Sequence, residues 1–254
     1  MSPAKKKPGK KQPSSDPPDS DDSSLPVFFH MPQEKWPWHQ FCQWYPSVFT
    51  VSKQEISALC GREVDPADPY GSITVTCAEQ FMMYCKAAYF GDTQRQARIM
   101  QEKDPKEQKK LGKGTVGFND ARWDEVKSKV VEVGSIAKFG QNPHLKAILM
   151  STGERLLVEA SRTDRIWGIG FKADEAMVNQ ANWGENRLGK ALMEARRILR
   201  EEEAQERMGT NSKTEEDVEE EEKTGGIAPP NTCPDNIGKV YTQLSLVPSK
   251  QLYT

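Results

Sequence analysis

A glutamate and a lysine seven positions apart, Glu79 and Lys86, are side chains whose types and spacing could support chemistry. They fall in a stretch that predicts a helix from Cys77 to about Phe90, and seven positions along a helix return to nearly the same face. A carboxylate and an amine facing one pocket can act as general acid or base and as nucleophile. Each has an ordinary explanation too: Thr76 and Glu79 match a capping box, and Lys86 could be a solvent-exposed lysine. Spacing alone leaves both interpretations open.

The segment 161–170 (SRTDRIWGIG) is a second candidate, because it combines acidic, basic and aromatic side chains in a glycine-containing loop. The guanidinium of Arg165 suits the geometry of a phosphate, and the indole of Trp167 suits stacking on a base or a sugar ring. Asp164 adds a carboxylate, and Gly168 allows a close approach of the backbone. The alternative is a tight turn in which arginine and aspartate pair at the surface.

The segment 182–190 (NWGENRLGK) places Asn186 and Arg187 at the start of a predicted helix, between Gly184 and Gly189. A helix N-terminus whose backbone N–H groups are accessible is an anion site. The segment has neither the G-x-G-x-x-G nor the P-loop spacing, so the glycines could instead serve a turn and close helix packing.

Helices are expected to position most of these side chains. Apolar periodicity and turn signals predict helices over about 77–90, 93–102, 105–112, 123–139, 142–152 and 188–199, the last running on past Glu203. Short strands are expected over 73–75 and 155–160, and the turn-rich stretch 60–72 is expected to be a loop. The predicted fold class is mainly α with a few short β-strands, in a single domain.

Composition divides the chain into three parts. Residues 1–24 form a Lys-, Pro-, Ser- and Asp-rich tail, residues 25–205 the domain, and residues 206–254 an acidic tail that is expected to be mostly disordered. The lysines at the start also fit a nuclear-import or nucleic-acid segment. The net charge of −2 gives no broad basic footprint for a nucleic-acid duplex.

Cysteine and histidine usage predicts an intracellular protein, cytoplasmic or nuclear. The five cysteines contain no C-x-x-C pair, and no apolar signal segment precedes them, so they are expected to be reduced thiols. The three histidines lack metal-ligand spacing, so no metal is expected. No apolar run is long enough to span a bilayer.

The order of these motifs resembles the NADAR, or YbiA-like, family over residues 41–199. The segments that carry the resemblance are 41–46 (FCQWYP), 78–87 (AEQFMMYCKA), Leu111-Gly112 with Trp123, 137–142 (AKFGQN) with Leu145, 157–161 (LVEAS) with Asp164 and Trp167-Gly168, and 184–189 (GENRLG) with Leu192-Met193. The family pattern usually has a histidine where this chain has Gln80, and Leu-Ser-Asn-Phe where this chain has residues 42–45. The loop 60–72 is also long enough to reshape the entrance to a site.

The resemblance implies a mainly helical fold and an N-glycosidase that acts on N-linked ribose without a cofactor. The family's substrates are phosphoribosylamino-pyrimidine intermediates of riboflavin synthesis or ADP-ribose attached to guanine, the latter carried on nucleic acid. By position, the resemblance makes Glu79, Lys86 and Asp164 the catalytic candidates. The substrate-binding candidates are Trp44, Trp123, Lys138, Arg165, Trp167, Gly168, Asn186 and Arg187.

Two mechanisms fit these residues. In one, Glu79 and Asp164 divide the tasks of activating water and protonating the leaving base. In the other, Lys86 attacks the anomeric carbon and holds the opened sugar as a Schiff base. This route explains why the family motif has a lysine at this position. Two rival functions remain: a module that binds ADP-ribose without cleaving it, and a nuclear adaptor that works through its charged tails.

Overall fold

The computed structural model describes residues 25–33, 35 and 38–223, with side chains up to residue 208. Helices dominate and the strands are short, which confirms the predicted fold class. The tail predicted at 1–24 and residues 224–254 of the tail predicted at 206–254 lie outside the described residues. In chain order the elements are β1 (Val27–Phe29), η1 (His39–Phe41), β2 (Phe49–Ser52), α1 (Lys53–Cys60), β3 (Ser72–Val75), α2 (Ala78–Phe90), α3 (Thr93–Gln101), α4 (Pro105–Lys113), α5 (Asp120–Gly140), α6 (Pro143–Ser151), β4 (Leu157–Glu159), α7 (Ala173–Ala176), η2 (Met177–Asn182) and α8 (Arg187–Lys223).

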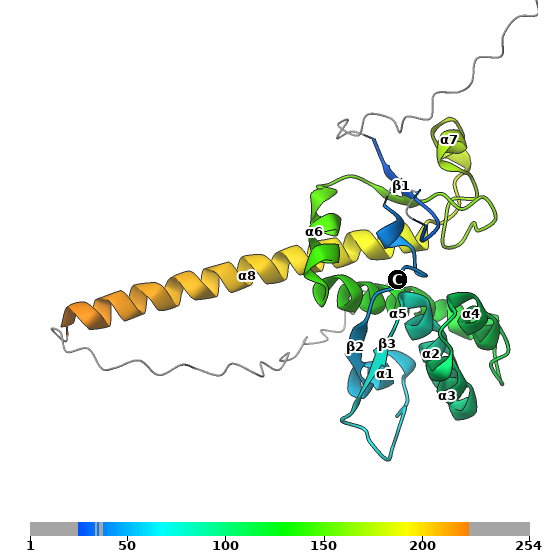
Figure 1. Ribbon diagram of the computed structural model, residues 1–254, viewed down its shortest axis with the longest axis horizontal. Coiled ribbons are helices and arrows are strands. Elements are labelled where there is room, and N and C mark those ends of the chain that lie inside the picture. The colour runs from blue at the N-terminus through cyan, green and yellow to red at the C-terminus, as the bar shows by residue number, and fades with distance from the viewer. Residues whose placement is uncertain (1–24, 34, 36–37, 224–254) are drawn as a thin grey trace, which may run out of the picture. The chain divides into compact units, whose positions relative to one another are not determined.

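Helix α2 is the centre of the domain. Eleven of its 13 residues are buried, because α1, α3, α4 and α5 all pack against it. Figure 1 shows α2, α3 and α4 grouped together beside α5. A helix that is buried on all sides is normally apolar throughout, yet α2 also buries Glu79, Gln80 and Lys86. These three polar side chains therefore need partners or a function.

Two small sheets complete the domain. β1 pairs with β4 in parallel, which sets Phe29 opposite Glu159, and β2 pairs with β3 in an antiparallel ribbon. A parallel pair needs a long connection, and here helices α1 to α6 lie between the two strands in sequence. The first sheet thus brings the start of the described chain next to Glu159.

The predicted helices and strands agree with the structure to within a few residues. One cap was wrong: α2 is capped by Cys77 rather than Thr76, and no side chain accepts a capping hydrogen bond there. The sequence analysis also missed α1, whose N-cap Ser52 accepts a hydrogen bond from Glu55 N, and it missed β1 and β2. These elements are short, and their pairing partners are distant in sequence.

Helix α8 begins at Arg187, close to the predicted start at 188. Its residues Leu188, Leu192 and Leu199 lie in the core. It continues to Lys223, beyond the domain limit predicted at 205. By backbone contacts, residues 1–206 form one unit and 207–254 another, and the predicted domain limits stay predictions. Among the described helices, none is long and apolar enough to cross a membrane.

Gln80 ties the start of α2 to the C-terminal end of α3. Its Oε1 accepts hydrogen bonds from the backbone N and the Oγ1 of Thr76, at 2.8 and 3.1 Å. Its Nε2 donates to backbone carbonyls of Ile99 and Glu102, at 2.9 and 3.1 Å. The position where the family pattern usually has histidine is therefore filled by a buried structural amide.

We expect Gln80→Leu to lower the free energy of unfolding by about 3 kcal/mol, because it leaves buried backbone groups without partners. Urea denaturation followed by circular dichroism measures this. Gln94→Leu, at an exposed position of α3, is the control and should change stability by less than about 0.5 kcal/mol. Equal effects of the two substitutions would contradict the structural role of Gln80.

Candidate active site

Lys138 on α5 holds the segment that carries Trp44. Its Nζ is buried and donates hydrogen bonds to the carbonyl oxygens of Gln40 and Cys42, at 2.7 and 3.0 Å. Burial lowers the pKa of this lysine to about 8, opposed by the thiols of Cys42 and Cys77. The family resemblance made Lys138 a substrate-binding candidate. The structure instead uses its ammonium inside the protein, where a phosphate has no access.

Trp44 in turn binds Glu79. The indole Nε1 donates to Glu79 Oε2 at 3.2 Å, and the backbone N of Glu79 donates to the carbonyl of Gln43. The capping-box interpretation of Glu79 is wrong, because its carboxylate turns toward Trp44. The other oxygen, Oε1, is buried without a hydrogen-bond partner in the described part of the chain. Burial raises the pKa of Glu79, opposed by the charges of Lys109 and Lys86 and by the Trp44 hydrogen bond.

Glu159, a partly buried residue at the end of β4, supplies a second carboxyl. Its backbone N donates to Asn186 Oδ1 at 3.0 Å, and Asn186 Nδ2 donates to the carbonyl of Leu157 at 2.8 Å. The side-chain Oε2 is buried and has no partner among the described residues. Burial, together with the nearby negative charges of Asp164 and Glu79, raises the pKa of Glu159 to about 8. Glu159 therefore carries a proton at neutral pH.

The two glutamates share one electrostatic environment with Lys109 on α4. The charge of Lys109 lowers the pKa of both Glu79 and Glu159, and its Nζ lies 5.8 Å from the centre of the Trp44 ring. Lys109 is exposed, unlike Lys86 and Lys138. It thus contributes a positive charge that favours the ionised form of both carboxyls.

Lys86 also belongs to this group, as the helical spacing predicted. It is buried, and its charge lowers the pKa of Glu79. Burial lowers the pKa of Lys86 itself, opposed by the negative charges of Asp120 and Glu79. Its Nζ lies 3.7 Å from the centre of the Phe118 ring. A lysine with a lowered pKa is neutral more often, and only the neutral amine is a nucleophile.

The loop 161–170 folds over the Glu159 end of β4. Asp164 Oδ1 accepts hydrogen bonds from the backbone N of Ile166 and of Trp167, at 2.9 and 2.8 Å. Gly168 is required here, because a Cβ at that position would lie 2.6 Å from the carbonyl oxygen of Glu159. Asp164 thus shapes the turn and adds negative charge beside Glu159.

The remaining predicted binding residues are distributed unevenly. Trp123 is buried in the core against Tyr89, whereas Trp167 is only partly buried. Arg165 is exposed and donates to the carbonyl of Asn182. Arg187 forms ion pairs with Glu185 and Asp124.

Asn186, a predicted binding residue, is buried, and both of its amide atoms are hydrogen-bonded to β4. Its backbone has a φ of 52°, in the left-handed region that asparagine tolerates better than most residues. In this structure Asn186 holds Glu159 in place instead of facing a ligand.

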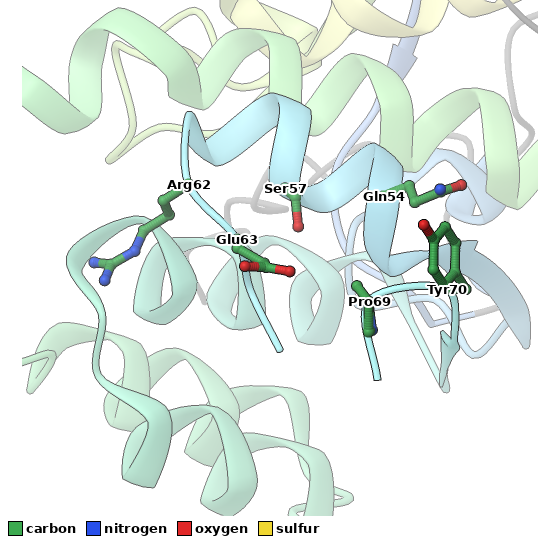
Figure 2. A pocket seen from close by; sticks show the side chains of 6 residues that line it. All are labelled: Gln54, Ser57, Arg62, Glu63, Pro69 and Tyr70. Atoms are coloured by element: carbon green, nitrogen blue, oxygen red, sulfur yellow. The ribbon is translucent and has the colours of Figure 1, made fainter. Parts of the chain in front are cut away.

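An open hollow of about 490 Å³ lies elsewhere, between α1 and the loop 61–71. Figure 2 shows Gln54 and Tyr70 at one end of it and Arg62 at the other. None of the residues that line the hollow is one of the charged residues of the candidate site, Glu79, Lys86, Lys109 and Glu159. The loop predicted at 60–72 is present, but the hollow beside it is separate from the candidate active site.

The sequence did not single out Lys109 or Glu159 as site residues. Lys109 lies in a helix with four lysines, and only the packing of α4 on α2 selects one of them. Glu159 follows two fully buried residues, Leu157 and Val158, in a strand of three. That pattern marks a strand with both faces covered, which was the available signal that Glu159 is shielded from water.

The chain belongs to the NADAR domain family, whose family model matches residues 28–200. Among its relatives, N-glycosidase R617 of Acanthamoeba polyphaga mimivirus is 38% identical over 67% of this chain and 94% of the relative. Protein irg-1 of Caenorhabditis elegans is 36% identical over 63% of this chain and 74% of the relative. N-glycosidase YbiA of Escherichia coli (strain K12) is 31% identical over 46% of this chain and 67% of the relative.

The fold comparison agrees with the family. The NMR structure of the E. coli protein YbiA superposes with a TM-score of 0.52 at 23% identity, over 71% of this chain and 88% of that one. The similarity supports the YbiA-like fold.

We expect Glu159→Gln to change how stability depends on pH. The folded protein keeps the Glu159 proton to about pH 8, whereas the unfolded chain loses it near the ordinary value of 4.5. The folded state thus binds more protons between these values, and its stability falls as pH rises through them. Glutamine cannot ionise, so the variant does not lose stability in this way. At pH 9 its free energy of unfolding should exceed that of wild type by on the order of 2 kcal/mol.

Urea denaturation at pH 5, 7 and 9 measures this difference. Glu125→Gln, at an exposed position of α5, is the control and should leave the pH dependence unchanged. Parallel pH curves for wild type and Glu159→Gln would show that Glu159 is ionised in the folded protein at neutral pH.

Proposed function

We propose that this chain, an N-glycosidase of the NADAR domain family, releases phosphorylated ribose from a nitrogen of a base. Two substrate classes fit the proposal: ADP-ribosyl-guanine, and the phosphoribosylamino-pyrimidines of riboflavin synthesis. The observation that carries it is that Glu79 and Glu159 each have a buried carboxyl oxygen without a partner among the described residues, and that the buried Lys86 interacts electrostatically with Glu79. The proposed site therefore combines an acid, a carboxylate and a nucleophile.

Cleavage of an N-glycosyl bond needs a proton for the leaving nitrogen and stabilisation of the positive charge that develops at the anomeric carbon. Glu159 suits the first task, because its raised pKa keeps it protonated at neutral pH. Asp164 suits that task less well, because one of its oxygens already accepts two backbone hydrogen bonds. Glu79, held by Trp44, suits the second task.

In the route that we favour, the neutral amine of Lys86 attacks the anomeric carbon. The bond to the base breaks as the leaving nitrogen takes the Glu159 proton. Opening of the ribose ring then gives a Schiff base on Lys86, and water hydrolyses it to return the amine and release the sugar. The lowered pKa of Lys86 supports this route.

In the other route, Glu79 activates a water molecule that attacks the anomeric carbon directly. Its unpartnered Oε1 is the oxygen that would accept the proton of that water. Lys86 then acts only through its charge. Both routes consume one water and release the base with one added proton, and they differ in whether a covalent adduct forms.

The test offers purified protein both substrates, ADP-ribosyl-guanine in single-stranded DNA and a phosphoribosylamino-pyrimidine, and follows ribose release by mass spectrometry. We expect wild type to cleave at least one of them. Glu79→Gln and Lys86→Ala should each lower the rate at least 100-fold, because each removes a group used in the transition state. Lys110→Ala, on the exposed face of α4, is the control and should keep full activity.

Sodium borohydride added during turnover distinguishes the routes. A reduced ribose adduct on Lys86, located by peptide mapping, supports the Schiff base, and activity without any adduct supports the water route. Tight binding of ADP-ribose with no release from either substrate would contradict the proposal and favour a binding module.

A further inference from the structure

Phe118 covers the amine of Lys86. The Lys86 Nζ lies 3.7 Å from the centre of the Phe118 ring, well within the range of a cation–π interaction. Among the described residues, Nζ forms no hydrogen bond and no ion pair. The ring is therefore the direct partner of the ammonium. Phe118 itself is 39% exposed, so its other side faces solvent.

The segment that presents Phe118 is anchored on both sides. Before it, the backbone N of Val116 donates to Asp92 Oδ2 at 2.9 Å. After it, Asn119 caps α5 by accepting a hydrogen bond from Arg122 N at 3.0 Å. Between these anchors, Gly117 has a φ of 71°, which glycine adopts without strain. The Phe118 ring then packs edge-on against Phe90, at 5.5 Å between ring centres.

Charges of both signs face Lys86 from the surrounding elements. Glu79 on α2 and Asp120 on α5 favour its charged form, whereas Lys113 on α4 and Lys127 on α5 oppose it. The nearest of these negative charges do not contact Nζ directly. The aromatic face thus provides the close interaction that the carboxylates do not.

We propose that Phe118 is a positioning residue for Lys86, whose ring binds the ammonium in the empty site and shields the amine from solvent. The functional part of this inference rests on the proposed function, because covering the amine affects catalysis only if Lys86 is the nucleophile. The physical interaction between ring and amine exists independently of any turnover.

The ring has two opposite effects on Lys86, and different substitutions separate them. Its negative face favours the ammonium, while its bulk removes water and favours the neutral amine. Phe118→Leu keeps an apolar cover and removes the aromatic face, so the amine should lose its proton at lower pH. Phe118→Ala removes both, so the amine should become more accessible to reagents.

The experiment is trace acetylation of the full chain with acetic anhydride between pH 6 and 11, without substrate. Lys86 is quantified by peptide mass spectrometry relative to the exposed Lys110, whose side chain is 75% exposed. We expect Phe118→Leu to increase Lys86 labelling at pH 8 about threefold to tenfold over wild type. Phe118→Ala should increase the limiting rate at pH 11 by at least as much.

Thermal unfolding checks that each variant is folded. If Phe118→Leu does not fold, Phe118→Met replaces it, because methionine is similar in size and also has no aromatic face. A Phe118→Leu or Phe118→Met profile that superimposes on wild type would overturn the proposal, as would an unchanged limiting rate in Phe118→Ala. Because the readout needs no turnover, it remains decisive even if the chain cleaves neither substrate of the functional test.

Discussion

Removal of the Glu79 carboxyl from water is the constraint on which the site depends. A buried carboxylate is costly unless it is paired, hydrogen-bonded or protonated, and Glu79 has one hydrogen bond to Trp44 and one oxygen without a partner. The fold meets this cost from three directions. Lys138 fixes the segment that carries Trp44, α4 brings Lys109 alongside, and Lys86 adds a second positive charge. These elements assemble a shielded acid–base group from distant parts of the chain.

Three lysines show how environment decides what one residue type does. Lys138 is fully surrounded and donates to two carbonyl oxygens, so it holds structure. Lys109 is exposed and acts at a distance on the carboxyl pair. Lys86 lies between these extremes, buried but with only an aromatic ring against its amine. Of the three, Lys86 has the surroundings that a nucleophilic amine requires.

The sequence predicted most of the helices, because apolar periodicity and capping residues are local signals. It also predicted that Glu79 and Lys86 share a face, which follows from helix geometry alone. It did not predict that Lys138 and Asn186 are internal, because both residue types are usually exposed and their partners are backbone atoms that only the tertiary fold brings near. Lys109 was missed for the same reason: nothing local distinguishes it from Lys106, Lys110 or Lys113.

Carbon-detected NMR of protein labelled with ¹³C in the glutamate side-chain carboxyls would test the central claim most directly. The carboxyl shifts of Glu79 and Glu159 would be followed from pH 3 to 10 and assigned with Glu79→Gln and Glu159→Gln. The account predicts that Glu159 titrates near pH 8 and that Glu79 titrates above its ordinary range. Titration of both carboxyls below about pH 5, as in exposed glutamates, would contradict it.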